Sequence, residues 1–298
     1  MHSDYRDLLK PEVINSISGL ELIARLVVDN FLSGLNHSRR VGAGMEFSQY
    51  RAYEPGDDLR LLDWKMLARS GRYYVKQAEI ETNVTVKFII DSSESMAYEE
   101  NGLTKLEFSK VIAASLGYLS HKQGDALGLF SLNDKSIFHL QPEVRKQHYL
   151  SFLQKLSQIQ NQGKWPKNPA VLEKFHDHSH REMIFLITDL YEYDTEISNL
   201  INSLKSPRNE IIVIHLMGRK EIEFDYSGTV ILEDLETKQR IKVNAAEARK
   251  KYLLQFNEHL KKLKDDFLAS NIHYHLFSME DDLNETLQFF LKNRTSFL

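Results

Sequence analysis

The fold is decided by one stretch, Val84-Thr85-Val86-Lys87-Phe88-Ile89-Ile90 running into Asp91-Ser92-Ser93-Glu94-Ser95-Met96. Its first seven residues are nearly all β-branched or aromatic, which is typical of a buried parallel strand. A helical stripe follows within a few residues, at Phe108, Val111, Ile112, Ser115, Leu116 and Leu119. Ligands of open α/β sheets bind at the carboxyl ends of the strands, so we expect the functional site in the polar loop after Ile90.

The loop offers only hard oxygen ligands. Asp91, Ser93 and Ser95 form an Asp-x-Ser-x-Ser pattern that suits Mg²⁺, with Mn²⁺ or Ca²⁺ as alternatives, and does not suit a closed zinc site. The pattern resembles the metal-ion-dependent adhesion site of von Willebrand factor A domains. In that family the two serines contact the ion, the first Asp often acts through water, and a distant Thr and Asp complete the protein's share. An acidic side chain of the partner fills the open position. The alternative is a loop that caps the next helix.

A second apolar run ends in a carboxylate in the same way. Met183-Ile184-Phe185-Leu186-Ile187-Thr188 leads into Asp189, at about the distance that the A-domain pattern requires. Two buried strands that each deliver an Asp at the carboxyl end fit one shared site. The alternative for Asp189 is the N-cap of a helix over 193–204.

Composition limits the class of protein. The chain has 298 residues, a formal net charge of −4 and no cysteine. No basic excess indicates nucleic acid as a partner, and disulfides, thiol catalysis and cysteine metal sites are excluded. The sequence has no apolar run long enough for a membrane span and no signal peptide at its start. We therefore expect a cytoplasmic protein.

Two regions are expected. Residues 1–80 form an N-terminal extension packed on the core, with helical segments over 11–33 that break near Gly19. An Arg/Asp-rich segment over 45–69 is interpreted as an ion-pair network with Trp64 inward, and a binding surface built from arginines is the alternative. Residues 81–298 alternate strands and helices, which predicts a mainly parallel sheet with helices on both faces. A small β-hairpin insertion is expected near 226–244.

A longer series of residues indicates a family. Glu46-Phe47, Arg51-x-Tyr53, Pro55-Gly56-Asp57-Asp58-x-Arg60, Asp63-Trp64 and Ala68-Arg69 precede the Asp91 motif. Together they closely resemble the MoxR-associated family, the domain of unknown function fifty-eight, over about residues 38 to 290. The resemblance implies a von Willebrand factor A-like fold and a Mg²⁺ site at Asp91, Ser93, Ser95 and Asp189. It also implies partnership with a MoxR-type AAA+ ATPase and its client proteins.

One departure from the family pattern concerns the Thr ligand. No hydroxyl residue occurs between Ser157 and Ser179, where the family supplies a Thr or Ser. Lys164 or Lys167 near the ion would repel it or substitute for its charge, so a vestigial site is an alternative. His176, His178 and His180 alternate nearby, but no fourth ligand is placed by spacing, and a solvated loop is the preferred interpretation.

The sequence thus favours a non-enzymatic protein-interaction module that works with a MoxR-type ATPase in chaperone-like assembly or maturation of a client complex. One alternative is a structural scaffold with a degenerate metal site. The other is a Mg²⁺-dependent phosphoester hydrolase. Against the hydrolase, the loop lacks a second nearby Asp, and no His is placed by spacing to activate Ser93 or Ser95.

Overall fold

The computed structural model describes residues 5–39, 50–52, 64–76, 84–145, 147–167, 181–191 and 196–283. Contacts divide the chain into two compact units, one made of Met1–Asp29 with Val84–Leu298 and the other of Asn30–Asn83. This division differs from the boundary expected at residue 80. The chain up to Asp29 belongs to the larger unit, and the expected apolar stripe is buried at Leu20, Ile23, Ala24, Val27 and Val28.

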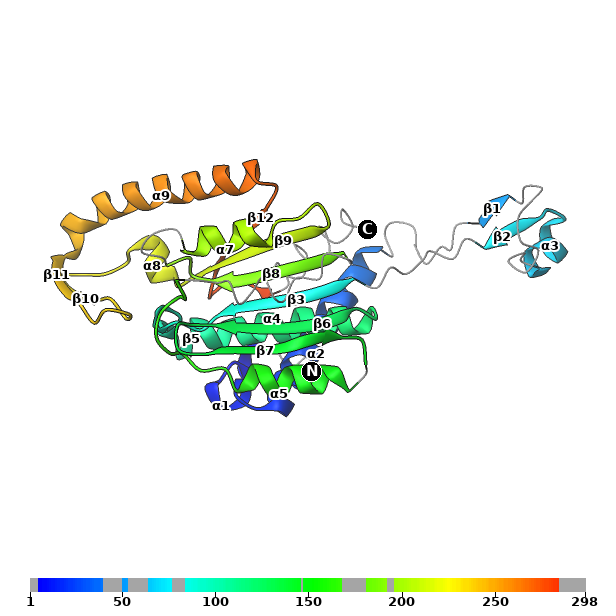
Figure 1. Ribbon diagram of the computed structural model, residues 1–298, viewed down its shortest axis with the longest axis horizontal. Coiled ribbons are helices and arrows are strands. Elements are labelled where there is room, and N and C mark those ends of the chain that lie inside the picture. The colour runs from blue at the N-terminus through cyan, green and yellow to red at the C-terminus, as the bar shows by residue number, and fades with distance from the viewer. Residues whose placement is uncertain are drawn as a thin grey trace. The chain divides into compact units, whose positions relative to one another are not determined.

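A six-stranded sheet with the order β12-β9-β8-β3-β6-β7 forms the centre of the larger unit (Figure 1). Its strands are β3 (Thr85–Asp91), β6 (Ala126–Leu132), β7 (Ile137–Glu143), β8 (Glu182–Thr188), β9 (Asn209–Met217) and β12 (His273–Ser278). All neighbours pair in parallel except β6 and the edge strand β7. The order along the sheet reverses between β3 and β8, and such a switch point is where ligands of doubly wound sheets bind.

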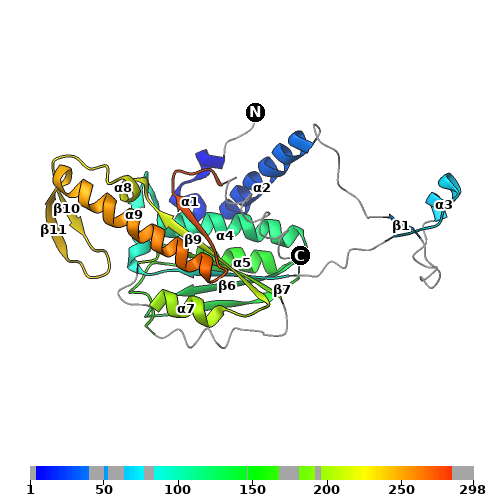
Figure 2. The same ribbon diagram turned by 90° about the horizontal axis from the view of Figure 1, so that it is seen from above.

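Helices cover both faces of this sheet (Figure 2). On one face, Phe88 of β3 stacks on Phe185 of β8 and meets Phe152 edge-on, with centroids 5.2 and 5.5 Å apart. That face packs against α4 (Lys105–Lys122) and α5 (His148–Ser157). On the other face, Ile89 belongs to a buried cluster with Leu200 of α7 (Glu196–Leu204) and Phe267 of α9 (Ala245–Ala269). The predicted fold class, a mainly parallel sheet between helices, is confirmed.

The N-terminal helices follow a short 3₁₀ turn, η1 (Tyr5–Leu8). They are α1 (Pro11–Ile14) and α2 (Ile17–Arg39), so the break lies at residues 15–16, earlier than expected. Gly19 serves another purpose. A Cβ at this position would lie 2.0 Å from the backbone oxygen of Val13. The glycine therefore permits the start of α2 to pack closely against the end of α1.

The smaller unit contains β1 (Tyr50–Ala52), α3 (Trp64–Ser70) and β2 (Tyr74–Lys76). The two strands pair antiparallel, and α3 begins at Trp64. The side chain of Trp64 and most side chains of the expected ion-pair network over residues 45–69 lie outside the described part of the chain. His176, His178 and His180 also lie outside it.

The carboxyl edge of the sheet carries several short elements (Figure 1). They are η3 (Glu94–Ala97), β4 (Glu99–Glu100), β5 (Leu103–Thr104) and α8 (Arg219–Glu223). The predicted hairpin insertion is present here as β10 (Thr229–Glu233) and β11 (Arg240–Asn244), a two-stranded sheet of its own. Among the helices that the structure describes, none combines the length and the apolar character needed to cross a membrane.

Candidate metal centre at the switch point of the sheet

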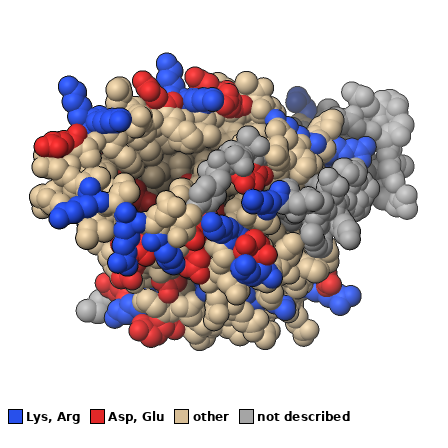
Figure 3. Space-filling model, turned by 60° about the vertical axis from the view of Figure 1, so that its left-hand side comes forward, with Lys and Arg blue, Asp and Glu red and all other residues tan. Residues whose placement is uncertain are grey.

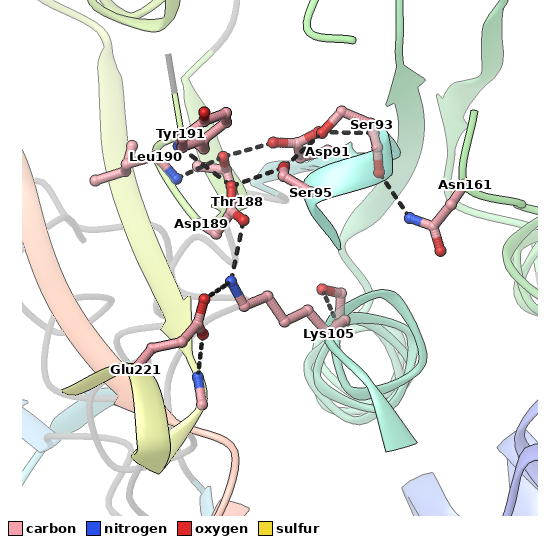
Figure 4. Close-up of polar contacts among 12 residues, drawn as sticks. Asp91, Ser93, Ser95, Lys105, Asn161, Thr188, Asp189, Leu190, Tyr191 and Glu221 are labelled. Carbon is pink, nitrogen blue, oxygen red and sulfur yellow. Dashed lines mark hydrogen bonds and ion pairs between the residues drawn. The ribbon is translucent and has the colours of Figure 1, made fainter. Parts of the chain in front are cut away.

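Asp91, the last residue of β3, is completely buried and held by three donors (Figure 4). Its Oδ1 accepts the backbone N–H of Ser93 at 2.9 Å and the Ser93 hydroxyl at 2.7 Å. Its Oδ2 accepts the hydroxyl of Thr188, the last residue of β8, at 2.7 Å. Burial, and then the charge of Asp189, raises the pKa of Asp91 to about 7. A carboxylate at this position therefore needs a positive neighbour to stay ionised.

The four residues predicted as ligands form one continuous chain of oxygen atoms. The hydroxyl oxygens of Ser93 and Ser95 lie 2.9 Å apart, and the Ser95 hydroxyl donates to Oδ1 of Asp189 at 3.1 Å. Three oxygen–oxygen contacts thus join Asp91, Ser93, Ser95 and Asp189, but the two hydroxyls carry only two protons. With both carboxylates ionised, one contact has no proton. A proton on Asp91 or a cation beside the serines would complete the arrangement.

The oxygen spacing suits a small divalent cation. Neighbouring ligands of an octahedral Mg²⁺ are about 2.9 Å apart, given metal–oxygen distances of about 2.0–2.1 Å. The Ser93–Ser95 and Ser95–Asp189 separations of 2.9 and 3.1 Å match that edge. In the described part of the chain, no group of three His, Cys, Asp or Glu side chains is placed to hold a metal. An ion at this edge would therefore depend on the serine hydroxyls.

Lys105, the first residue of α4, supplies a positive charge that the sequence interpretation did not include. Its Nζ lies 3.1 Å from Oδ2 of Asp189 and 2.9 Å from Oε1 of Glu221. The lysine is buried, and burial alone would lower its pKa, but the two carboxylates outweigh that effect and raise it. Lys105 therefore balances part of the charge of Asp189 without a metal. Lys105 is thus a positive charge at the ligands in addition to the Lys164 or Lys167 expected from the sequence.

The loop that lacks the family's hydroxyl still supports the site through other groups. Asn161 donates its side-chain amide to the backbone oxygen of Ser93 at 2.8 Å. Backbone bonds of 2.9 Å join Gln162 to Ser92 and Glu94 to Gly163. In Figure 4, Asn161 lies on the far side of Ser93 from Asp189. The described part of this loop, up to residue 167, thus fixes the serine loop by hydrogen bonds other than those of a hydroxyl ligand.

The β10–β11 hairpin brings further carboxylates to the same edge. Tyr191, two residues after Asp189, donates its hydroxyl to Oδ2 of Asp234 at 2.8 Å. Burial, and then the charges of Asp91 and Asp189, raises the pKa of Glu236 to about 7. A cavity of about 350 Å³ lies between the hairpin and the sheet edge, lined by Ser95, Lys105, Asp189, Tyr191, Leu232 and Ile241 among others. The face is visibly hollowed, with acidic atoms at the hollow (Figure 3).

Comparisons with known proteins agree with the sequence resemblance. The family model described as protein of unknown function DUF58 matches residues 49–262. The uncharacterized protein Rv1480 of Mycobacterium tuberculosis (strain ATCC 25618 / H37Rv) is 23% identical over 242 residues, which cover 78% of this chain and 73% of that protein. The uncharacterized protein Mb1516 of Mycobacterium bovis matches with the same figures.

Similar solved structures are distant in sequence. The conserved hypothetical protein BatB from Bacteroides thetaiotaomicron is 13% identical with a TM-score of 0.44, covering 72% of this chain and 100% of that chain. The SpRpn10 VWA domain is 14% identical with a TM-score of 0.42, covering 69% of this chain and 94% of that chain.

Proposed function

Because the chain belongs to the family described as protein of unknown function DUF58, we propose that it is a non-enzymatic protein-interaction module that binds through the sheet edge at β3 and β8. Ser93, Ser95 and Asp189 would hold a divalent cation, Mg²⁺ or Mn²⁺, with Asp91 bonded to Ser93 behind them. The cation would supply an open coordination position for a carboxylate of the partner.

One observation carries this proposal: three oxygen contacts share two hydroxyl protons at a buried pair of carboxylates. Burial and mutual repulsion act against the charged form of Asp91, so this corner gains from a cation. Serine hydroxyls and carboxylates are the donors that Mg²⁺ prefers. The protein's own contribution is rigid placement, because Asp91 also ties the serine loop to Thr188 of the neighbouring strand.

We extend the proposal to the partner that the family resemblance implies, a MoxR-type AAA+ ATPase together with its client. In that role the chain would bring the ATPase and its client together during assembly or maturation of the client complex. Its specificity would come from an acidic side chain offered by the partner.

Hydrolysis of a phosphoester receives less support from the described residues. The Ser93 hydroxyl contacts only Asp91 and Ser95, and neither serine hydroxyl is hydrogen-bonded to a histidine or lysine there. His215 lies beside the Asp189 backbone, but burial lowers its pKa to about 3 and its Nδ1 is bonded to the Tyr274 hydroxyl. A nucleophilic serine needs an adjacent base. Among the described residues, the group that accepts from the Ser93 hydroxyl is the Asp91 carboxylate, which is completely buried and also held by Thr188.

A scaffold with a degenerate site is the second candidate, and Lys105 favours it. Its ammonium already lies 3.1 Å from Asp189, where it compensates a charge that a cation would otherwise balance. The two candidates differ in one property, since only the interaction module needs a divalent cation for partner capture.

Calorimetric titration with Mg²⁺ and Mn²⁺ distinguishes them. Ser95→Ala and Asp91→Asn should abolish binding, while Ser227→Ala, an exposed serine outside the site, serves as the matched control. Capture of the ATPase should then require Mg²⁺ and fail in EDTA. Undiminished capture in EDTA, with no titratable ion, would support the scaffold instead.

A further inference from the structure

The cavity between the β10–β11 hairpin and the sheet edge extends the candidate site to one side. It shares Ser95 and Asp189 with the proposed cation ligands, and its volume of about 350 Å³ is within the usual range of ligand cavities, about 300–1,000 Å³. Its apolar and aromatic walls are made by Tyr98, Tyr191, Leu232, Leu235 and Ile241. The cavity therefore has room for a second side chain of a partner, beside the one that reaches the cation.

The hairpin turns an apolar face toward this cavity and leaves it accessible to solvent. Ile241 pairs with Leu232 across the hairpin, so the two side chains share the face that lines the cavity. Ile231 pairs with Lys242 and lies on the other face. Ile241 is 59% exposed and Tyr191 is 39% exposed. An aliphatic group that covers this face would gain free energy by removing apolar surface from water.

The lining of the cavity carries an excess of negative charge. Lys105 is paired with Asp189 and Glu221, and Arg240, outside the lining, is paired with Glu233. Figure 3 shows acidic atoms at the floor of a hollow whose walls are largely uncharged. The charged residues among the described ones that line it are four acids and one base, Asp189, Glu221, Glu233, Asp234 and Lys105.

This charge selects the class of occupant. A purely apolar side chain would take carboxylates out of water without supplying a counter-charge, which costs free energy. An acidic side chain that does not reach the cation would be repelled. A cationic head on an aliphatic stem satisfies both the walls and the charge, because such side chains cover apolar surface with the stem and keep the charge at the tip.

The aromatic wall favours arginine within this class. Nζ of Lys105 lies 5.0 Å from the centroid of the Tyr98 ring, so the chain itself already places a cation over one of the tyrosines. A guanidinium is more weakly hydrated than an ammonium, stacks on aromatic faces and pairs with carboxylates through two N–H groups. Glu233 and Asp234 lie at the hairpin end of the lining, away from the pairs that Lys105 makes.

From these features we infer that the cavity binds an arginine side chain of the protein partner, with its stem on Leu232 and Ile241 and its guanidinium toward Glu233 and Asp234. The inference adds a second recognition element to the proposed function and does not require the cation. The partner segment would offer an arginine close to its acid. Two groups of opposite charge, each with its own receptor, would fix the direction in which that segment lies across the sheet edge.

Short capped peptides test this inference on the full chain, with the backbone amide NMR signals of residues 229–244 as the readout. In EDTA, a Gly-Arg-Gly peptide should shift the hairpin signals saturably. The Gly-citrulline-Gly peptide has the same shape without the charge and should bind about tenfold more weakly, the usual contribution of a hydrogen bond to a charged group. A Gly-Glu-Gly peptide should bind only when Mg²⁺ replaces EDTA, as the proposed function requires.

The two exposed isoleucines of the hairpin provide matched variants. Ile241→Thr should weaken binding of the arginine peptide about fourfold, roughly the loss of one buried CH₂ group. Ile231→Thr makes the same change on the other face of the hairpin and should bind the peptide as the wild type does.

Equal affinity for the arginine and citrulline peptides, or equal effects of the two isoleucine variants, would overturn this inference. Binding of the glutamate peptide that depends on Mg²⁺ would then leave the proposed function standing. Conversely, specific binding of the arginine peptide without any Mg²⁺-dependent binding of the glutamate peptide would overturn the proposed cation site and support the arginine cavity alone.

Discussion

Asp91 combines a structural duty with its proposed part in cation binding, and two substitutions separate these. Its two oxygens accept bonds from Ser93 N, Ser93 Oγ and Thr188 Oγ1. Asp91→Ala leaves two buried donors, the Ser93 N–H and the Thr188 hydroxyl, without this acceptor, at about 1–3 kcal/mol each, while the Ser93 hydroxyl can still donate to Ser95. We expect a loss of several kcal/mol in the free energy of unfolding, measured in urea with EDTA. Asp91→Asn keeps one acceptor oxygen and should lose clearly less. Equal losses would show that the acceptor oxygen retained by the asparagine contributes little.

Lys105 should compete with a divalent cation for Asp189. Replacing it with Met removes the ammonium from between Asp189 and Glu221 and leaves two acids without their cation. Loss of one partner from a buried pair costs about 3–5 kcal/mol. We expect Lys105→Met to melt well below the wild type in EDTA and to recover more of that loss on addition of Mg²⁺ than the wild type gains. A variant that melts at the same temperature with and without Mg²⁺ would contradict this competition.

At the residue scale, local spacing predicts some of the site and not the rest. Asp91, Ser93 and Ser95 are close in sequence, and Asp189 ends a recognisable strand, so their convergence follows from strand geometry. Lys105 looks like an ordinary solvated residue at a helix start, because its partners lie 84 and 116 positions away. The contact of Thr188 with Asp91 had one available signal, its position immediately before Asp189.

At the element scale, β3 and β8 are joined by a charged pair in addition to their ladder. Lys87 of β3 is ion-paired with Glu182 of β8, and their side chains are only 5% and 1% exposed. Lys87→Met should lower the free energy of unfolding by about 3–5 kcal/mol, because it removes one partner of a buried ion pair. Equilibrium unfolding in urea measures the loss.

The double variant Lys87→Met with Glu182→Leu tests the cause. Apolar residues of similar volume often replace a buried pair without loss. Recovery of most of the lost stability would identify the broken ion pair as the cause, whereas an additive loss would point to packing. Affinity for Mn²⁺ should be unchanged in the double variant, because Glu182 lies beside Thr85, at the opposite end of β3 from Asp91.

The elements themselves follow from the sequence more readily than their contacts. Alternating apolar strands and helical stripes predict the sheet and its covering helices, and turn residues predict the hairpin over 226–244. The helix break illustrates the limit. A glycine usually weakens a helix, but Gly19 is required by the approach of Val13, a contact that appears only in three dimensions. The Tyr191–Asp234 bond that places the hairpin tip has no local signature either.

At the scale of the whole molecule, stability couples to pH through a pair at the other end of the sheet. Glu210 of β9 and His273 of β12 lie with Oε1 and Nε2 3.0 Å apart. Burial raises the pKa of Glu210 to about 7, and burial lowers the pKa of His273. Both groups are therefore shifted toward their neutral forms. As the pH rises, the shift of Glu210 lowers the free energy of unfolding and the shift of His273 raises it. Each group must therefore be tested by comparing a variant with the wild type.

Glu210→Gln isolates the glutamate. The folded wild type binds a proton on Glu210 that the unfolded chain releases near pH 4.5, so this group's contribution to stability is full below that pH. The contribution is lost as the pH rises through about 7. The difference in the free energy of unfolding, variant minus wild type, should therefore move in the variant's favour between pH 4.5 and 7 and then level off. Urea unfolding at a series of pH values gives this curve.

His273→Gln keeps Glu210 and removes the opposing effect of the histidine. The free energy of unfolding of this variant should therefore fall more steeply with rising pH than that of the wild type. A difference that is constant from pH 5 to 8 would show that the Glu210 carboxyl is not held neutral by the fold.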